Sequence, residues 1–404
     1  MLVERKEYLK NLLSWKDEKI IKVVSGLRRS GKSTLLKQYQ TKLRELGVSE
    51  DRIIYINFED LDNENLLNYN VLHSYIESRL VKDKMSYIFL DEIQRVDNFP
   101  KCVDSLYIKD NTDIYITGSN AYLLSGELAT LLSGRYVELS ILPLSFQEFV
   151  ELNNKTNQLD KAFSDYMKYG GMPYLSTMEK TEEKVTLYLE GIYNTVVVKD
   201  ILDRETKKGT RRVTDISLLN TIARYLSSVI GSPVSVKAVT DYLTSNGRKV
   251  SLNTIDDYIS ALTESYLFYP CHRYDISGKE FLKNNGKFYM VDLGLRNHLL
   301  PKRNYDLGFS IENIVFLELK RRGWKVSTGK LRNTEVDFVA AKDGDLTYFQ
   351  VTADMTQEAT FEQEMKSLRA IKDNYPKTIL TLDRFTEGSY EGIKVINLID
   401  WLLD

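Results

Sequence analysis

The sequence is poor in the residues that build disulfide frameworks and metal centres. Its 404 residues include only two cysteines, Cys102 and Cys271, and three histidines without metal-ligand spacing. Two cysteines so far apart predict no disulfide framework, which is typical of a protein in a reducing cytosol. The first residues lack the apolar core of a signal peptide, and no apolar run approaches the roughly 20 residues of a membrane span. We therefore expect a cytoplasmic protein without a membrane partner.

The chain also lacks a strong net charge. It has 55 Lys and Arg against 57 Asp and Glu, which gives a formal net charge of −2, and 43% of its residues are apolar. No global basic field attracts nucleic acid, so any such binding has to come from local patches. A chain of 404 residues exceeds what one core usually holds, so we expect about two to four domains.

What the sequence does contain is a phosphate-binding loop between a predicted strand and a predicted helix. The apolar run Ile21–Val24 leads to Gly26, four further residues and then Gly31-Lys32-Ser33, the G-x-x-x-x-G-K-[ST] pattern. The glycines let backbone N–H groups point at phosphate oxygens, and the following helix adds the positive end of its dipole. We expect Lys32 to reach the β- and γ-phosphates of ATP and the Ser33 hydroxyl to ligate Mg²⁺. The predicted nucleotide contacts are Gly26, Arg28, Arg29, Ser30, Gly31, Lys32, Ser33 and Thr34.

A second motif follows about 60 residues later, where the apolar run from Ser86 to Leu90 ends in Asp91-Glu92. We expect Asp91 to hold the Mg²⁺ shell and Glu92 to orient and deprotonate the attacking water. A further strand, Asp113–Thr117, runs into Gly118-Ser119-Asn120, whose polar side chains either sense the γ-phosphate or form a plain turn.

The order of strands and helices predicts the fold class of this region. Predicted strands at 21–24, 52–58, 86–91, 113–117 and 136–142 alternate with helical segments. Such alternation predicts an α/β fold with a parallel sheet, helices on both faces and the ligand at the carboxyl ends of the strands.

These motifs together resemble the predicted AAA+ ATPases of bacteria and archaea, in which an AAA domain is joined to a C-terminal domain of unknown function. The resemblance is carried by the phosphate loop with Arg28-Arg29, Leu90–Gln94, Thr117–Ser119, Leu132–Arg135 and Pro143–Phe149, and it continues to the C-terminus. It implies a five-stranded AAA-type core.

The resemblance also implies roles for single residues. Ser119 or Asn120 would be the sensor, and Arg135 is either an arginine finger or a structural arginine. Arg28 and Arg29 either neutralise phosphate or lie in a solvated loop. The chain lacks a clear Gly-x-Arg lid motif of ring-forming AAA+ enzymes, which puts a hexameric ring in doubt.

The middle of the chain is predicted to be helical and then to form a winged helix. Tyr169–Tyr174, with two glycines and a proline, marks a sharp turn at the start of a helical lid, and the basic run 207–212 is a solvated loop or a nucleic-acid contact. Residues 232–292 give helix, turn, helix and hairpin. The second helix is acidic, which disfavours base reading, so we expect any DNA binding to be weak, non-specific and made by Lys283 and Lys287 of the hairpin. A winged helix that packs on protein is at least as well supported.

The last hundred residues predict a restriction-endonuclease-like core, in the order α-β-β-β-α-β. Such a core binds Mg²⁺ through acids on a helix and two strands and needs a lysine beside the attacking water. The corresponding positions here are Glu312, Glu335, Asp337, Gln350 and Thr352. Gln350 stands where a second acid is needed and Thr352 where the lysine is needed, so we predict a degenerate site without nuclease activity. Plain hairpin residues or a docking module are the alternatives.

The predicted domains are 1–155 (ATP-binding), 156–230 (helical lid and linker), 231–305 (winged helix) and 306–404 (nuclease-like). We expect a Mg²⁺-dependent ATPase that couples hydrolysis to the remodelling of nucleic acid or of a protein partner. A slow nucleotide switch that signals through its C-terminal half is the first alternative, and an ATP-coupled nuclease is the second.

Overall fold

The computed structural model describes residues 3–118, 132, 134–202, 213–300, 307–332 and 334–404. The chain forms two compact units. The N-terminal unit extends to Leu142 and includes Glu264–Tyr266, and the C-terminal unit comprises Pro143–Thr263 and Leu267–Asp404. Among the described residues, no helix combines the length and the apolar character needed to cross a membrane.

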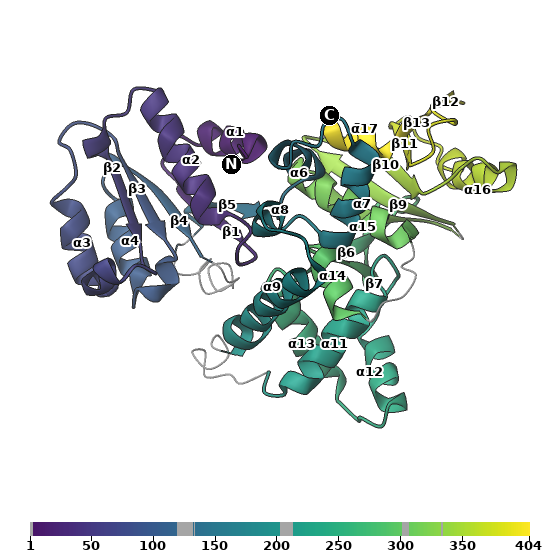
Figure 1. The fold of residues 1–404 in the computed structure, drawn as a ribbon, viewed down its shortest axis with the longest axis horizontal. Helices are drawn as coiled ribbons and strands as arrows, with labels where there is room; N and C mark the ends of the chain where they lie inside the picture. The colour runs from purple at the N-terminus through teal and green to yellow at the C-terminus, as the bar shows by residue number, and fades with distance from the viewer. Residues whose placement is uncertain (1–2, 119–131, 133, 203–212, 301–306, 333) are drawn as a thin grey trace. The chain divides into compact units, whose positions relative to one another are not determined.

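The N-terminal unit is built on the parallel sheet that the sequence predicts (Figure 1). Its five strands are paired in the order β2-β3-β4-β1-β5, and each pair is parallel. The strands are β1 (Ile21–Gly26), β2 (Ile53–Asn57), β3 (Ser86–Asp91), β4 (Thr112–Thr117) and β5 (Tyr136–Ile141). The predicted five-stranded α/β core is confirmed.

Helices cover both faces of this sheet. The helices are α1 (Lys6–Ser14), α2 (Lys32–Glu45), α3 (Tyr69–Glu77) and α4 (Phe99–Tyr107), with short 3₁₀ turns η1 (Glu50–Arg52), η2 (Leu61–Leu67) and η3 (Ile93–Arg95). On one face α1 and α2 pack against the strands through buried leucines such as Leu12 and Leu36. On the other face α3 and α4 do so through Ile76 and Leu106. Helix α4 was not predicted from the sequence.

A buried ion pair joins β1 and β4 inside this unit. Lys22 and Asp113 are each 1% exposed, and Lys22 Nζ lies 2.5 Å from Asp113 Oδ1. Lys22 also donates to the Glu18 carbonyl at 2.7 Å, and the Tyr115 hydroxyl donates to Asp113 Oδ2 at 2.9 Å. A buried pair with these additional hydrogen bonds is costly to break by removing one partner.

The C-terminal unit begins with helices. They are α6 (Phe146–Leu152), α7 (Leu159–Tyr169), α8 (Pro173–Thr177), α9 (Glu182–Asn194), the π-helical η5 (Thr195–Ile201), α11 (Ile216–Ser228), α12 (Val236–Ser245), α13 (Leu252–Glu264) and α14 (Leu293–Leu299). The predicted sharp turn lies between α7 and α8. There the Gly171 N–H donates to the buried Asp292 carboxylate at 2.7 Å. Gly170 has φ +78°, and a Cβ on it would lie 2.2 Å from Asp292 Oδ1, so this turn requires glycine.

One eight-stranded sheet organises the rest of the unit, in the order β12-β13-β11-β10-β9-β8-β6-β7. Its strands are β6 (Phe268–Asp275), β7 (Glu280–Met290), β8 (Lys325–Leu331), β9 (Thr334–Lys342), β10 (Asp345–Thr352), β11 (Lys377–Thr381), β12 (Gly388–Tyr390) and β13 (Ile393–Asn397), and the remaining helices are α15 (Leu307–Arg321), α16 (Glu358–Arg369) and α17 (Leu398–Leu403). The predicted α-β-β-β-α-β order is present from α15 to β11. However, β6 pairs with β8, so the hairpin of the predicted winged helix extends this sheet. The boundary predicted between residues 305 and 306 does not separate two sheets.

Candidate active site

The phosphate loop connects β1 to α2 at the carboxyl edge of the parallel sheet. Gly26 has φ +136°, and a Cβ there would lie 2.3 Å from the Ile141 carbonyl oxygen of β5. Gly31 caps α2 with φ +103°. The side chain of Lys32 is 4% exposed and turns onto the loop, where its Nζ donates to the Gly26 and Leu27 carbonyls at 3.1 and 3.2 Å. The lysine is therefore already positioned inside the loop that the sequence assigns to phosphate.

A buried arginine near the N-terminus contacts the phosphate loop. Arg5 is 3% exposed, and its guanidinium donates to the Ser30 carbonyl at 3.1 Å and to the Leu142 carbonyl at 2.7 Å. Its backbone N–H donates to Gln38 Oε1 of α2 at 3.2 Å. Arg5 was not predicted as a site residue, because one arginine in a charged segment carries no signal of its partner.

The two predicted acids lie at the end of β3 and are linked through a hydroxyl of β4. Thr117 Oγ1 donates to Asp91 Oδ1 at 2.5 Å and accepts a hydrogen bond from the Glu92 N–H at 2.9 Å. Asp91 is fully buried, and its Oδ2 accepts from the Tyr55 hydroxyl at 2.8 Å. Burial, reinforced by the Asp91 charge, raises the pKa of Tyr55, so this phenol remains a donor.

Glu92 adopts an unusual backbone conformation beside this link. Its φ is +58°, a left-handed conformation that is uncommon for a residue other than glycine. Its Oε2 accepts a hydrogen bond from Gln94 Nε2 at 2.6 Å, and the residue is 7% exposed. The Glu92 backbone N–H, which donates to Thr117, and the Glu92 carboxylate, which accepts from Gln94, are therefore both positioned by hydrogen bonds.

The donor set at this edge suits a magnesium ion held together with phosphate. Asp91 supplies carboxylate oxygens at the end of β3, and Ser33 supplies a hydroxyl in the first turn of α2. Mg²⁺ prefers oxygen ligands and is usually bound by one or two carboxylates together with substrate phosphates and water. The residues present therefore fit this ion.

Two regions of the chain match described protein families. Residues 18–150 match a family described as an AAA domain, and residues 160–306 match a domain of unknown function, DUF8612. An uncharacterized protein of Haemophilus influenzae is 40% identical over 406 residues, which cover 100% of this chain and 99% of that protein. The uncharacterized protein MJ1544 of Methanocaldococcus jannaschii is 32% identical over 93% of this chain and 84% of its own length. The chain belongs to a family of AAA-type P-loop ATPases with a C-terminal domain of unknown function.

Solved structures show weaker similarities to this member of the AAA-type family. The Walker-type ATPase PABY2304 of Pyrococcus abyssi is 17% identical, with 74% of this chain and 96% of that chain covered and a TM-score of 0.44. The Aeropyrum pernix Orc1 protein, solved in complex with DNA, is 15% identical, with 74% and 92% covered and a TM-score of 0.33. Both TM-scores lie below 0.5.

The arginines predicted for the AAA site have different surroundings. Arg28 lies 3.6 Å from the Glu59 carboxylate, and Arg29 has φ +63° within the loop. Arg135 is exposed, stacks over the Tyr107 ring at 5.4 Å, and precedes the first residue of the six-residue strand β5. That end of β5 is roughly 20 Å of strand away from the carboxyl edge, at about 3.3 Å per residue.

Arg135 therefore does not belong to the phosphate site of its own chain, and a finger role would require a second copy. The predicted sensors Ser119 and Asn120 lie outside the described residues, as does the basic run 207–212. Thr117 is the described β4 residue that contacts the acids. A hydroxyl at the last position of a buried strand was the one signal that could have identified it.

In the C-terminal unit the structure brings together four of the five nuclease-like positions. Asp337 and Glu335 lie on β9, Glu312 on α15 and Gln350 on β10, and the Asp337 N–H donates to Gln350 Oε1 at 3.3 Å. Thr352 instead donates to the Asp354 carbonyl at 3.4 Å.

A lysine occupies this cluster, and it comes from a position that the sequence analysis assigned to DNA. Lys287 is 3% exposed and is paired with Glu312 and Glu335. The prediction that Lys287 contacts a nucleic-acid backbone is therefore wrong, because a surface contact needs an accessible ammonium. Lys283 lies outside the residues whose side chains the structure describes.

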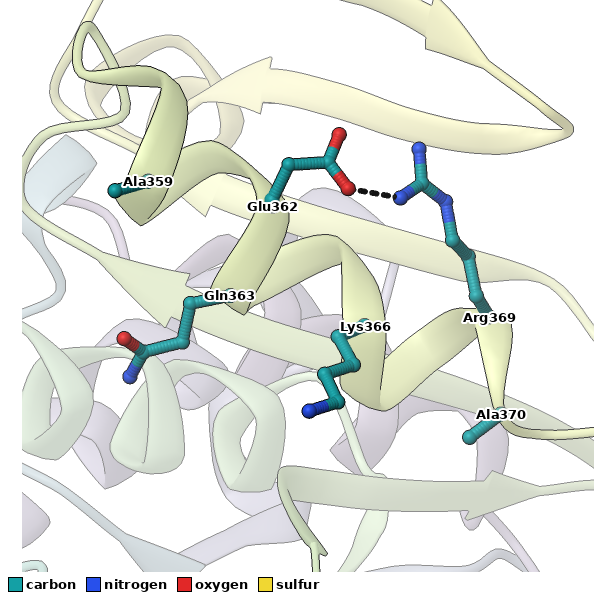
Figure 2. Close-up of a pocket in the computed structure, with 6 residues that line it drawn as sticks. All are labelled: Ala359, Glu362, Gln363, Lys366, Arg369 and Ala370. Atoms are coloured by element: carbon teal, nitrogen blue, oxygen red, sulfur yellow. Dashed lines mark hydrogen bonds and ion pairs between the residues drawn. The ribbon is translucent and has the colours of Figure 1, made fainter.

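An open recess runs along the outer face of α16 (Figure 2). Its lining residues are Ala359, Glu362, Gln363, Lys366, Arg369 and Ala370. Arg369 is paired with Glu362 at 2.5 Å and with Glu391 at 2.9 Å. Side chains of both charges on an exposed helix are typical of a solvated face, so we assign this recess no chemistry.

Proposed function

We propose that the AAA domain binds ATP with Mg²⁺ and hydrolyses it at the carboxyl edge of the five-stranded sheet. The observation that carries the proposal is the pair Asp91 and Glu92, held by Thr117 at the same sheet edge as the G-x-x-x-x-G-K-S loop. Membership of a P-loop ATPase family supports it.

Each residue has a distinct task in this proposal. Lys32 leaves the loop carbonyls to contact the β- and γ-phosphates, and Ser33 and Asp91 would hold a bound Mg²⁺. The ion, when bound, neutralises charge that develops on the transferred phosphoryl group. Glu92 accepts the proton of the attacking water as a general base. For this, Glu92 has to exchange its Gln94 hydrogen bond of 2.6 Å for one with water.

ATP hydrolysis has two candidate functions. An intact acid pair favours an enzyme that remodels nucleic acid or a protein partner. The hydrogen bond between Gln94 and Glu92 favours a slow switch, since it occupies the general base. Asp256 on α13 is exposed, which supports our expectation that DNA is bound weakly and without base reading. A cytoplasmic location and the domain boundaries remain predictions.

The test is phosphate release from Mg-ATP by the wild-type chain and by Lys32→Ala, without nucleic acid and with DNA or RNA. We expect turnover in the wild type and none in the variant. Stimulation by nucleic acid supports the remodelling form, and slow, unstimulated turnover supports the switch. Equal rates in wild type and Lys32→Ala would reject the assignment of the site.

A further inference from the structure

A buried lysine lies inside the acidic cluster of the C-terminal unit, which we define as Glu312, Glu335 and Asp337. The Nζ atom of Lys287 is 2.9 Å from Glu312 Oε1 and 2.7 Å from Glu335 Oε1. These are distances of charge-assisted hydrogen bonds. One ammonium therefore connects carboxylates of two elements, α15 and β9, to the strand β7 that carries it.

Neighbouring contacts fix the position of this lysine. The Tyr289 hydroxyl donates to Glu312 Oε1 at 2.5 Å. The Asn313 side chain accepts from the Met290 N–H at 2.8 Å and donates to the Met290 carbonyl at 2.9 Å. Since β7 and α15 are joined at these adjacent positions, Lys287 is held in the cluster by the register of its strand.

The charges of the cluster favour an ammonium at this position. Burial alone lowers the pKa of Lys287, but the carboxylates of Glu312, Asp337 and Glu335 outweigh burial and raise this pKa above its ordinary value. Burial, and then the charge of Glu312, raise the pKa of Asp337 well above its ordinary value. The lysine of the cluster therefore stays charged.

One oxygen of each acid in the cluster, and of Gln350, contacts a donor within the chain. Asp337 Oδ2 accepts from the Val351 N–H at 2.8 Å, and Gln350 Oε1 accepts from the Asp337 N–H. The other two acids face Lys287. Among the residues that the structure describes, no three Asp, Glu, His or Cys side chains are grouped to hold a metal ion. Mg²⁺ needs near-octahedral oxygen ligands, so these residues do not fit it.

We propose that the ammonium of Lys287 is the permanent cation of the acidic cluster. It joins β7 of the β6–β7 hairpin to α15 and β9, and the cluster binds no divalent metal. The substitutions at Gln350 and Thr352 are consistent with this role, since neither an extra acid nor a second lysine is needed. This inference does not depend on ATP hydrolysis.

The first test measures the opening of the hairpin in the full-length chain. Cys271 pairs with Lys287 across β6 and β7 and is fully buried, so its labelling rate by a thiol reagent reports this opening. We expect Lys287→Met to raise the opening equilibrium roughly 10²–10⁴-fold, the converted cost of leaving a buried charge unpaired. Adding Glu312→Gln to Lys287→Met should lower this opening equilibrium again by at least about tenfold. Lys325 is an exposed lysine of β8, so Lys325→Met is the control and should leave the labelling rate of Cys271 unchanged. Equal labelling rates in Lys287→Met and Lys325→Met would overturn the proposal.

The second test needs no destabilised variant. Binding of Mn²⁺ is measured by electron paramagnetic resonance in the wild-type chain and in Asp337→Asn, both with an intact ATP site. We expect identical binding curves and no Mn²⁺-dependent cleavage of single- or double-stranded DNA. A Mn²⁺ site that is present in the wild type and lost in Asp337→Asn would overturn the proposal. Mn²⁺-dependent cleavage by the wild type that is lost in Asp337→Asn would overturn it as well.

Discussion

Thr117 links the two acids of the ATP site, so we expect Thr117→Val to disturb both of them. The substitution is nearly isosteric and replaces the hydroxyl of a fully buried residue by a methyl group. Asp91 loses a charge-assisted hydrogen bond of 2.5 Å, which contributes about 1.5–3 kcal/mol. The Glu92 N–H loses its acceptor at 2.9 Å, which costs about 1–3 kcal/mol for a buried donor left unpaired. The two terms together destabilise the N-terminal unit by roughly 2.5–6 kcal/mol.

The same change should slow catalysis more than it weakens ATP binding. Glu92 keeps its left-handed φ of +58° through the Thr117 contact, and a displacement of about 1 Å in a catalytic base costs roughly 10²-fold in rate. The assays are denaturant unfolding and steady-state ATP turnover, with kcat and KM determined separately. We expect kcat to fall and KM to change little.

Thr117→Ser is the matched control, because it keeps the hydroxyl and removes a methyl group. It should retain most of the rate and of the stability. If Thr117→Val has the stability and kcat of Thr117→Ser, then the hydroxyl does not position the acids and the reasoning is refuted.

Three further predictions concern buried groups in the two units. Asp113→Asn leaves the Lys22 ammonium buried without its counter-charge, so the free energy of unfolding should fall by about 3–5 kcal/mol in denaturant titrations; an unchanged midpoint would contradict this. Burial raises the pKa of Cys102 and of Cys271 to about 12, so at pH 8 both thiols should react with iodoacetamide only after the structure around them opens. Bound ATP should slow the reaction of Cys102 more than that of Cys271. Burial raises the pKa of Asp292 from 3.8 to about 6, so the stabilising contribution of the protonated carboxyl is complete below about pH 4 and is lost as the pH rises through 6. At 1.36 kcal/mol per pKa unit this contribution is about 3 kcal/mol. The free energy of unfolding of Asp292→Asn should lack this component of the pH dependence.

Local sequence patterns were sufficient to predict the five-stranded sheet and the position of the candidate ATP-site residues on it. The phosphate loop is a continuous motif, and Asp91 and Glu92 lie at the end of a run of buried residues, so the strand and its candidate acids could be located together. Each strand of the five-stranded sheet is a short apolar segment bounded by polar residues, which explains why all five were predicted close to their observed positions.

The contacts that support the site could not be predicted in this way, because they join residues far apart in the chain. Arg5 contacts the Leu142 carbonyl, and Lys287 contacts Glu335; neither partner can be identified from local spacing. A basic residue in a hairpin has the same sequence signal whether it faces DNA or a buried acid. For the same reason, the pairing of β6 with β8 was not predicted, since the alternation of a hairpin does not identify the strand beside it.

The measurement that tests the central claim most directly compares ATP binding and single-turnover hydrolysis in the wild type and in Glu92→Gln, with Mg²⁺ present. If Glu92 is the general base next to the phosphate loop, the variant should bind ATP as tightly as the wild type and cleave it roughly 10²–10⁴-fold more slowly. Hydrolysis of bound ATP by Glu92→Gln at the wild-type rate would contradict the assignment of this site.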